Sequence, residues 1–290
     1  MQRIEKIQHR AKLFVFDLEF IGDIQDLKTC HIWEIAVFSL ERKECFSRVV
    51  DPDSTLDVFP VPPIPEIPRL TREFLTQENA ISWKVAFREL CDWISIETQN
   101  GAIPVFISHN TFRADKPVLE LECRRYECVL PYNWYFFDSL HYSRDIMRNR
   151  GNYSLSGLHE QIFNTPIQSA HRAEADVTAC VDILGHLTNQ TFVLNGPIYP
   201  AYVTSLRSIR WVGRKAENTL VENGILSTES LFMVIYQNIR FDYIHNSIDS
   251  EESVQRTLQQ LLSQLPVENI TNITDVVNTM LKSPFSLAFM

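Results

Sequence analysis

The chain lacks any long run of apolar residues. Its longest runs, such as Leu13–Phe16, are far shorter than the roughly 18 residues that a membrane helix needs. The first residues, MQRIEKIQHRAK, contain neither the apolar stretch nor the small-residue cleavage site of a secretory signal. We therefore expect an intracellular protein that is neither secreted nor membrane-bound, with cytoplasm and nucleus both open.

Closely paired cysteines are also missing. Six cysteines are scattered along the chain and none forms a C-x-x-C pair. This pattern argues against a zinc site or a disulfide framework and fits a reducing compartment.

The chain also lacks an excess of positive charge. The chain has 27 Lys and Arg residues against 36 Asp and Glu residues, a formal net charge of −9. This balance argues against a protein that coats nucleic acid without specificity. It leaves open a site where carboxylates bind metal ions, because the ions then carry the local positive charge. Apolar residues make up 45% of the 290, enough for one large or two ordinary folded domains.

The first third of the chain has the composition of β-strands. Three apolar segments, 12–20, 32–40 and 45–50, are joined by short polar connections. Such connections favour an antiparallel meander. A segment with five prolines in nine positions follows at 60–68 and predicts an ordered surface loop.

The next part of the chain alternates between helical and strand patterns. This alternation predicts β-α-β units added to the meander, hence an α/β fold with a mixed sheet flanked by helices. Helices are expected at 71–97, 115–126, 154–163 and about 172–187, and strands at 105–108 and 135–137.

Residues 191–203 contain one glycine and two prolines, which predicts a linker between two domains. The first domain would span 1–190. The second would span 204–290 and be smaller and mostly helical.

Two carboxylates stand at the end of the first strand segment. Asp17 and Glu19 alternate with Leu18, so they point to the same face of a sheet, about 6.6 Å apart along the strand. A cation near such a pair would relieve its repulsion. Taken alone, the pair is equally consistent with exposed acids at a strand end.

Three further polar residues stand near predicted helix starts. Asp115 opens one helix, where it could also act as a cap. Asp176 begins the otherwise apolar face of another helix. His171 precedes Asp176 by five residues and reaches the same site only if it lies on the loop that enters the helix. An ordinary surface histidine is the alternative.

Together these segments resemble a known family. FDLEF at 16–20, HNTFRADKPVL at 109–119 and HRAEAD at 171–176 occur in the order found in DEDDh 3′–5′ exonucleases, the DnaQ-like branch of the ribonuclease H-like fold. The middle segment is most similar to TREX-type members. The resemblance covers roughly residues 10–190. Phe20 and Ile21 depart from it, since many members have a small residue or Thr there, and the proline-rich loop is also atypical.

The resemblance implies a site for two divalent ions. Asp17 would bridge both ions, Glu19 and Asp176 would complete the protein ligands of the first, and Asp115 would hold the second. His171 would be the general base, a role that suits an imidazole. Mg²⁺ or Mn²⁺ is expected because both prefer oxygen ligands.

The resemblance also implies hydrolysis from the 3′ end of nucleic acid, as single strands or 3′ ends, with DNA favoured over RNA. Aromatic and apolar side chains could stack on bases and arginines could contact phosphates. Core packing, turn formation and a solvated helix face are the alternatives for these residues. The candidates are Phe20, Ile21, Asn110, Phe112, Arg144 and Arg148.

Residues 204–232 resemble a helix-hairpin-helix module, but Trp211 stands where the first glycine of its turn is expected. Residues 205–216 contain four basic residues and no acidic residue. Contact with DNA phosphates and binding of a protein partner therefore both stay open. Gly224 is expected to end a helix.

Two alternatives to a DNA exonuclease remain. One is an exoribonuclease with the same chemistry. The other is a catalytically silent module that keeps the fold to bind a partner, although such a module has no physical reason to keep clustered like charges.

Overall fold

The computed structural model describes residues 2–24, 26–52, 59, 70–148, 151–203, 205–208, 212–222 and 224–231. The chain divides into two compact units, Gln2–Tyr202 and Val203–Met290, the latter with Met1. The proline-rich segment 60–68 lies outside the described residues. Among the helices that the structure describes, none has the length and apolar character to cross a bilayer.

One sheet organises the first unit. The described residues form eight strands in the order β1-β8-β7-β6-β2-β3-β4-β5. Their bounds are β1 Gln2–Arg3, β2 Ala11–Asp23, β3 Asp26–Ser39, β4 Glu44–Asp51, β5 Ile81–Ser82, β6 Ile103–Ser108, β7 Tyr135–Asp138 and β8 Pro197–Pro200.

Strand directions confirm the predicted mixed sheet. β2, β3 and β4 pair antiparallel, as the short connections between them require. β6 pairs parallel with β2, and β7 parallel with β6, because helices cross between these strands. The predicted α/β architecture, a mixed sheet flanked by helices, is therefore present in this unit.

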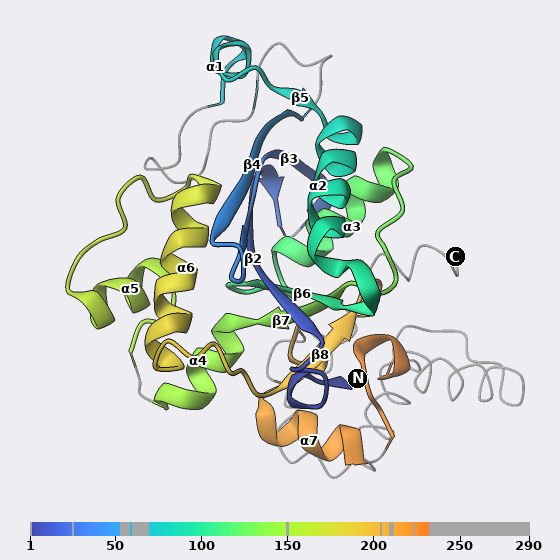
Figure 1. The fold of residues 1–290 in the computed structure, drawn as a ribbon, viewed down its shortest axis with the longest axis vertical. Helices are drawn as coiled ribbons and strands as arrows, with labels where there is room; N and C mark the ends of the chain where they lie inside the picture. Colours follow the sequence, from blue (N-terminus) through green and yellow to red (C-terminus); the bar gives the residue numbers. More distant parts are fainter. Residues whose placement is uncertain are drawn as a thin grey trace, which may run out of the picture. The chain divides into compact units, whose positions relative to one another are not determined.

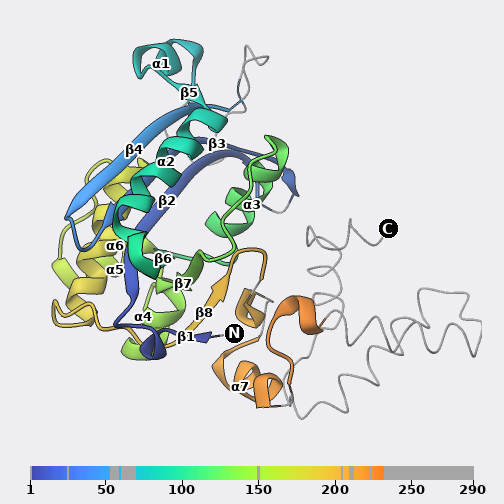
Figure 2. The same ribbon diagram turned by 45° about the vertical axis from the view of Figure 1, so that its right-hand side comes forward.

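Helices cover both faces of the sheet (Figure 1). α6 lies on one face, and α2 and α3 lie on the other, as Figure 2 also shows. The described helices of this unit are α1 Arg72–Gln77, α2 Trp83–Thr98, α3 Asp115–Arg125, α4 Ser139–Met147, α5 Leu155–Phe163 and α6 Ala173–Leu187.

Alternation along β2 assigns its side chains to these two faces. Val15 packs in one core cluster with Val177 and Leu184 of α6. Phe14 points the other way, with its ring 5.9 Å from that of Trp93 on α2. Successive side chains of a strand alternate, so every second residue after Val15 also faces α6.

The helix predicted at 71–97 is wrong in one respect, because it is two helices. α1 ends at Gln77, and Asn79 then adopts a left-handed φ of 53° that a continuing helix cannot contain. The chain next forms β5, where Ile81 pairs with Val50 of β4, before α2 begins. The apolar spacing that predicted a helix, at residues such as Trp83, Phe87 and Leu90, lies entirely in α2 and gave no information on the residues before it.

The linker predicted at 191–203 also needs correction. This segment contains β8, which pairs antiparallel with β7 and with β1. Ile198 and Tyr199 are fully buried, so the segment is part of the first unit. Gly196 precedes β8, Pro197 is its first residue, a position where proline is tolerated, and Pro200 is its last.

The described part of the second unit is helical. It contains the short 3₁₀ helix η3 at Leu206–Ser208 and α7 at Arg214–Glu222. Gly224 follows α7 with a left-handed φ of 81° and donates its N–H to the carbonyl of Val221, as expected for a residue that ends a helix. Trp211 lies outside the described residues, so the hairpin turn stays a prediction.

Candidate active site

The centre of β2 brings two acids to the face that α6 covers. Asp17 and Glu19 have the same parity as Val15, and both are half-buried. Asp17 lies opposite Ala36 of β3, and Glu19 lies opposite Glu34. The register between β2 and β3 shifts directly after Glu19, so the regular ladder ends where the acids are. Such irregularities re-aim side chains at functional sites.

Asp115 reaches the same strand from the start of α3. Its Oδ1 accepts the backbone N–H of Leu18 at 3.3 Å, and its Oδ2 accepts the Ser108 hydroxyl at 2.8 Å. These two bonds fix the carboxylate beside β2 between the acids at positions 17 and 19. Asp115 is 4% exposed.

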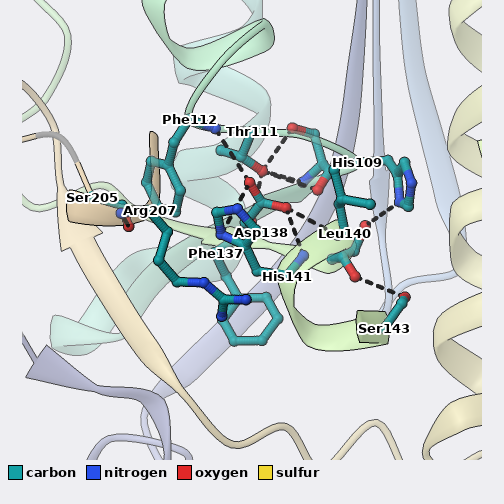
Figure 3. A network of polar contacts seen from close by, with 12 residues as sticks. His109, Thr111, Phe112, Phe137, Asp138, Leu140, His141, Ser143, Ser205 and Arg207 are labelled. Carbon is teal, nitrogen blue, oxygen red and sulfur yellow. Dashed lines mark hydrogen bonds and ion pairs between the residues drawn. The ribbon is translucent and has the colours of Figure 1, made fainter. Parts of the chain in front are cut away.

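A hydrogen-bond network supports Ser108 (Figure 3). The Thr111 hydroxyl donates to the carbonyl of Phe137 at 2.8 Å and accepts the backbone N–H of Ser108 at 3.1 Å. Beside it, Asp138 caps α4 by accepting the N–H groups of Leu140 and His141, at 2.9 and 3.2 Å. The turn that carries Asp115 is therefore tied to the ends of β6 and β7.

His171 and Asp176 enter from the opposite side, at the start of α6. His171 lies on the loop before the helix with φ 67°, and its backbone N–H donates to Asp176 Oδ2 at 3.1 Å. His171 therefore lies on the loop that enters α6, as its five-residue separation from Asp176 requires. Potential ligand atoms of Glu19, His171 and Asp176 all lie within 4.8 Å of one another.

Burial and mutual repulsion shape the charge of this cluster. Burial raises the pKa of Asp17 well above its ordinary value, and the charges of Asp115, Glu19 and Asp176 raise it further. Burial raises the pKa of Glu19 to about 8, with Asp176 and Glu34 adding to it. Both shifts have the same two causes, burial and the charges of neighbouring acids, and a bound cation would oppose both.

Two other carboxylates of the cluster follow the same pattern. Burial raises the pKa of Asp115 to about 7, although the hydrogen bonds from Ser108 and Leu18 act in the opposite direction. Burial also raises the pKa of Asp176, while the N–H of His171 lowers it.

The donor set fits hard divalent cations. Four carboxylates offer oxygen atoms, which Mg²⁺ and Mn²⁺ prefer, and no thiolate joins them in the cluster of described residues. Arg172 lowers the pKa of Glu19, but its guanidinium hydrogen-bonds Glu34. Asp17, Glu19 and Asp176 could therefore hold one ion, and Asp17 and Asp115 a second.

Glu34 and Ser108 are site residues that the motif analysis missed. Glu34 is 1% exposed and lies within the apolar run IWEIAV, where a single acid needs a partner. That isolated charge was the available signal. Ser108 carried no comparable signal, because a serine after a strand is common in turns.

Comparisons with known proteins found similar structures at low sequence identity and at TM-scores below 0.5. No protein-family model matches the chain, and no curated protein matches it in sequence. The fold is similar to that of cell-death related nuclease 4 (CRN-4), at 14% identity and TM-score 0.46, over 63% of this chain and 66% of that one.

A second similar structure is the nuclease domain of 3′hExo, a DEDDh family member, bound to rAMP. Its identity is 11% and its TM-score 0.48, over 65% of this chain and 97% of that domain. A 3′-exonuclease from a structure of histone mRNA stem-loop recognition matches at 10% identity and TM-score 0.48, over 65% of this chain and 70% of that one. These likenesses concern the fold, so the assignment of the site rests on its own geometry.

The apolar substrate candidates differ in accessibility. Phe20 is half-buried directly beyond Glu19, whereas Ile21 is 9% exposed and packs with Trp33 and Leu75. Phe112 is 3% exposed, with its ring 5.1 Å from that of Tyr199. The core-packing alternative therefore describes Phe112, and Phe20 is the apolar candidate with an accessible surface.

The polar candidates lie on the turn before α3 and on α4. Asn110 has φ 77°, and its carbonyl accepts the N–H groups of Arg113 and Ala114, so it shapes the turn. Arg144 and Arg148 are exposed, and the guanidinium of Arg144 lies 5.7 Å from the ring centroid of Tyr153.

His109 is a structural neighbour of these residues. Burial lowers its pKa, which favours a neutral ring. One ring nitrogen hydrogen-bonds the hydroxyl of Ser139 at 3.0 Å and the other the carbonyl of Tyr153 at 2.8 Å. Both nitrogens are thus used to join α4 to the loop before α5.

Proposed function

We propose that this protein is a metal-dependent 3′–5′ exonuclease that hydrolyses phosphodiester bonds at the 3′ end of nucleic acid, with DNA favoured over RNA. One observation carries the proposal. Glu19, His171 and Asp176 converge to within 4.8 Å, and Asp17 and Asp115 stand beside them on β2 and α3. Four acids from three elements, β2, α3 and α6, thus stand near a histidine from the loop before α6.

Each of these residues has a defined task in the proposed reaction. Two bound divalent ions would stabilise the charge on the attacking and leaving oxygens of an in-line displacement. Asp17, Glu19, Asp115 and Asp176 would hold and orient these ions. The His171 ring would accept a proton from the attacking water.

The backbone of His171 supports this role. Its left-handed conformation brings the residue out of line with α6, and its N–H is held by Asp176. The ring therefore faces the carboxylates from a fixed backbone. A free loop would have to order at each turnover, which would slow the reaction.

The polarity of attack and the preference for DNA come from the sequence resemblance. The segment HNTFRADKPVL has the spacing of TREX-type enzymes, with Asp115 six residues after His109 and Pro117 two residues later. Phe20 is our candidate for stacking against a terminal base, because it is accessible beside Glu19. Arg144 and Arg148 are candidates for contact with the phosphate backbone.

The test is cleavage of matched single strands of DNA and RNA, each labelled at either the 5′ or the 3′ end, in Mg²⁺, in Mn²⁺ and in chelator. We expect stepwise shortening from the 3′ end, dependent on metal and faster on DNA. Faster shortening of RNA would establish the exoribonuclease alternative. Specific binding without cleavage in either metal would contradict the proposal and favour the silent module.

A further inference from the structure

A partly buried ion pair lies next to the proposed site, between Glu34 and Arg172. Glu34, in the middle of β3, is 1% exposed, and its carboxylate accepts Nε of Arg172 with both oxygens, at 3.1 and 3.0 Å. Nη2 of Arg172 adds a third bond at 2.9 Å. Planar guanidinium and carboxylate groups that meet in this way fix both direction and distance.

The same carboxylate also holds the first turn of α6. Glu34 Oε2 accepts the backbone N–H of Ala173, the first residue of the helix, at 3.1 Å. The residue before the helix, Arg172, makes no side-chain cap of its own. The first turn of a helix usually obtains a hydrogen-bond acceptor from a nearby side chain in the sequence. Here Glu34 supplies that acceptor from β3.

Arg172 and Ala173 directly follow His171 in the chain. The backbone at position 171 is in the left-handed region, with φ 67°, which non-glycine residues occupy only when their surroundings hold them there. The four hydrogen bonds to Glu34 hold the next two residues, and the bond to Asp176 holds the N–H of His171. The loop is thus fixed on both sides of the histidine.

The pair also limits the charge of the site. Glu34 stands opposite Glu19 across β2 and β3, and its charge adds to the rise of the Glu19 pKa. The guanidinium of Arg172 acts in the opposite direction on Glu19. Glu34 thus anchors the loop without leaving a fifth uncompensated charge beside the proposed ligands.

We propose that Arg172 and Glu34 are positioning residues, which hold the loop and first turn of α6 so that His171 and Asp176 face Glu19. This proposal rests on the proposed function for its catalytic consequence. Its structural part, the fixed loop, stands on the geometry alone. Neither residue needs to contact substrate for this role.

Arg172→Lys is the informative change. Lysine keeps the positive charge but lacks the planar guanidinium that donates several hydrogen bonds to one carboxylate. The matched control is Arg42→Lys. Arg42 also pairs with a glutamate, Glu97, and lies 4.0 Å from the ring centroid of Trp93, as Arg172 lies 5.5 Å from that of Phe74. Arg42 contacts α2 on the opposite face of the sheet and has no part in the proposed site.

The experiment has two readouts on the full chain. The first is amide hydrogen exchange of residues 171–176 in the metal-free protein. We expect exchange there to be at least about tenfold faster in R172K and unchanged in R42K, since only the former loses the anchor. The second is kcat and KM on a labelled DNA strand in Mn²⁺, where we expect R172K to lose about tenfold in kcat with KM within about twofold.

A double variant separates positioning from general damage. If Arg172 acts through His171, H171A/R172K should be no slower than H171A alone. Losses that multiply would overturn the proposal, as would wild-type exchange and turnover in R172K. If R172K does not fold, E34Q is measured in its place, because Gln keeps an oxygen for the N–H of Ala173 and loses the ion pair.

The two proposals fail in different ways. A wild-type chain that cleaves no strand in either metal overturns the proposed function. The exchange measurement then decides by itself whether the Arg172–Glu34 pair fixes the loop.

Discussion

Two sets of buried charges on opposite faces of the same sheet differ in how they are neutralised. On the α3 side, Lys116 is 1% exposed and pairs with Glu120, which is 5% exposed. Its ammonium lies 5.5 Å from the Phe136 ring, and Glu120 also accepts the backbone N–H of Tyr202 at 2.7 Å. Every charge there has a partner within the chain.

The α6 side has no such balance. Burial and the neighbouring acids raise the pKa of Asp17, and burial raises that of Glu19 to about 8. A buried acid that serves structure has its cation built into the fold, as Glu120 does. Acids that lack one depend on protons or on cations from solution. The contrast is what the proposed function expects: the clustered acids Asp17, Glu19, Asp115 and Asp176 would bind metal, whereas Glu120 serves packing.

Asp17→Asn should cause the largest loss of the activity that we assign to the α6 side. The charges of Asp115, Glu19 and Asp176 all act on its carboxylate, and its loss removes the proposed bridge between two ions. We expect cleavage to fall to background in both Mg²⁺ and Mn²⁺, with a folded protein by circular dichroism. Retention of even a tenth of the wild-type turnover would contradict the two-metal assignment.

His171→Ala should have the next largest effect. Loss of a positioned general base lowers rate by roughly 10²–10⁴-fold. Substrate affinity should change little, because the ring is assigned to proton transfer. Single-turnover rates and strand binding, measured on the same preparations, check this. Near-normal turnover would show that the histidine has no catalytic role.

Lys116→Met tests the α3 side. It leaves Glu120 buried without its cation, which destabilises proteins by roughly 3–5 kcal/mol. Urea denaturation should show this loss, while the turnover of the folded fraction stays near wild type. K116M/E120Q should recover part of the stability, since Gln keeps an oxygen for the N–H of Tyr202. An unchanged unfolding midpoint for K116M would remove the contrast between the two faces.

The pH dependence of stability should also distinguish the two faces. Below about pH 4 both the folded and the unfolded chain protonate these carboxyls, which then carry no penalty. As pH rises, the unfolded chain releases its protons first. The free energy of unfolding of the metal-free protein should therefore fall until pH passes the raised pKa values, about 7 for Asp115 and about 8 for Glu19.

Glu19→Gln is the control for this effect, because it removes one titrating group and keeps the side-chain volume. The decrease in melting temperature between pH 5 and pH 8 should be smaller in E19Q than in wild type. An equal decrease in both proteins would mean that Glu19 does not contribute the expected penalty.

The sequence predicted the elements that have a local signal. The apolar period of α6, the strand pattern of β2 and the short turns of the meander each appear within a few residues. The break between α1 and α2 was missed, because it depends on Ile81 pairing with β4, a contact distant in sequence. β8 was missed for the same reason, since its prolines obscured a strand whose partners lie far along the chain.

The site residues remain a prediction from the sequence. Asp17, Glu19, Asp115, His171 and Asp176 were selected together, because the three segments that contain them resemble one family, whereas each residue alone allowed an ordinary explanation. The roles of Ser108 and Glu34 depend on side-chain geometry between elements. A single acid in an apolar run was the one local signal for Glu34, and Ser108 had none. Phe112 shows the opposite error, since a loop aromatic can be accessible or buried and only the fold decides.

The most direct test of the central claim is the effect of Mn²⁺ on melting. A metal that binds only the folded state stabilises it by about 2.7 kcal/mol at a hundredfold excess over its dissociation constant. We expect wild type to melt several degrees higher in Mn²⁺ and chelator to reverse the shift. Asp115→Asn should melt no lower than wild type without metal, because its amide can still bond Leu18 and Ser108 and one repelling charge is gone, and its metal shift should be smaller. A wild-type melting temperature indifferent to Mn²⁺, together with a destabilised D115N, would contradict the account.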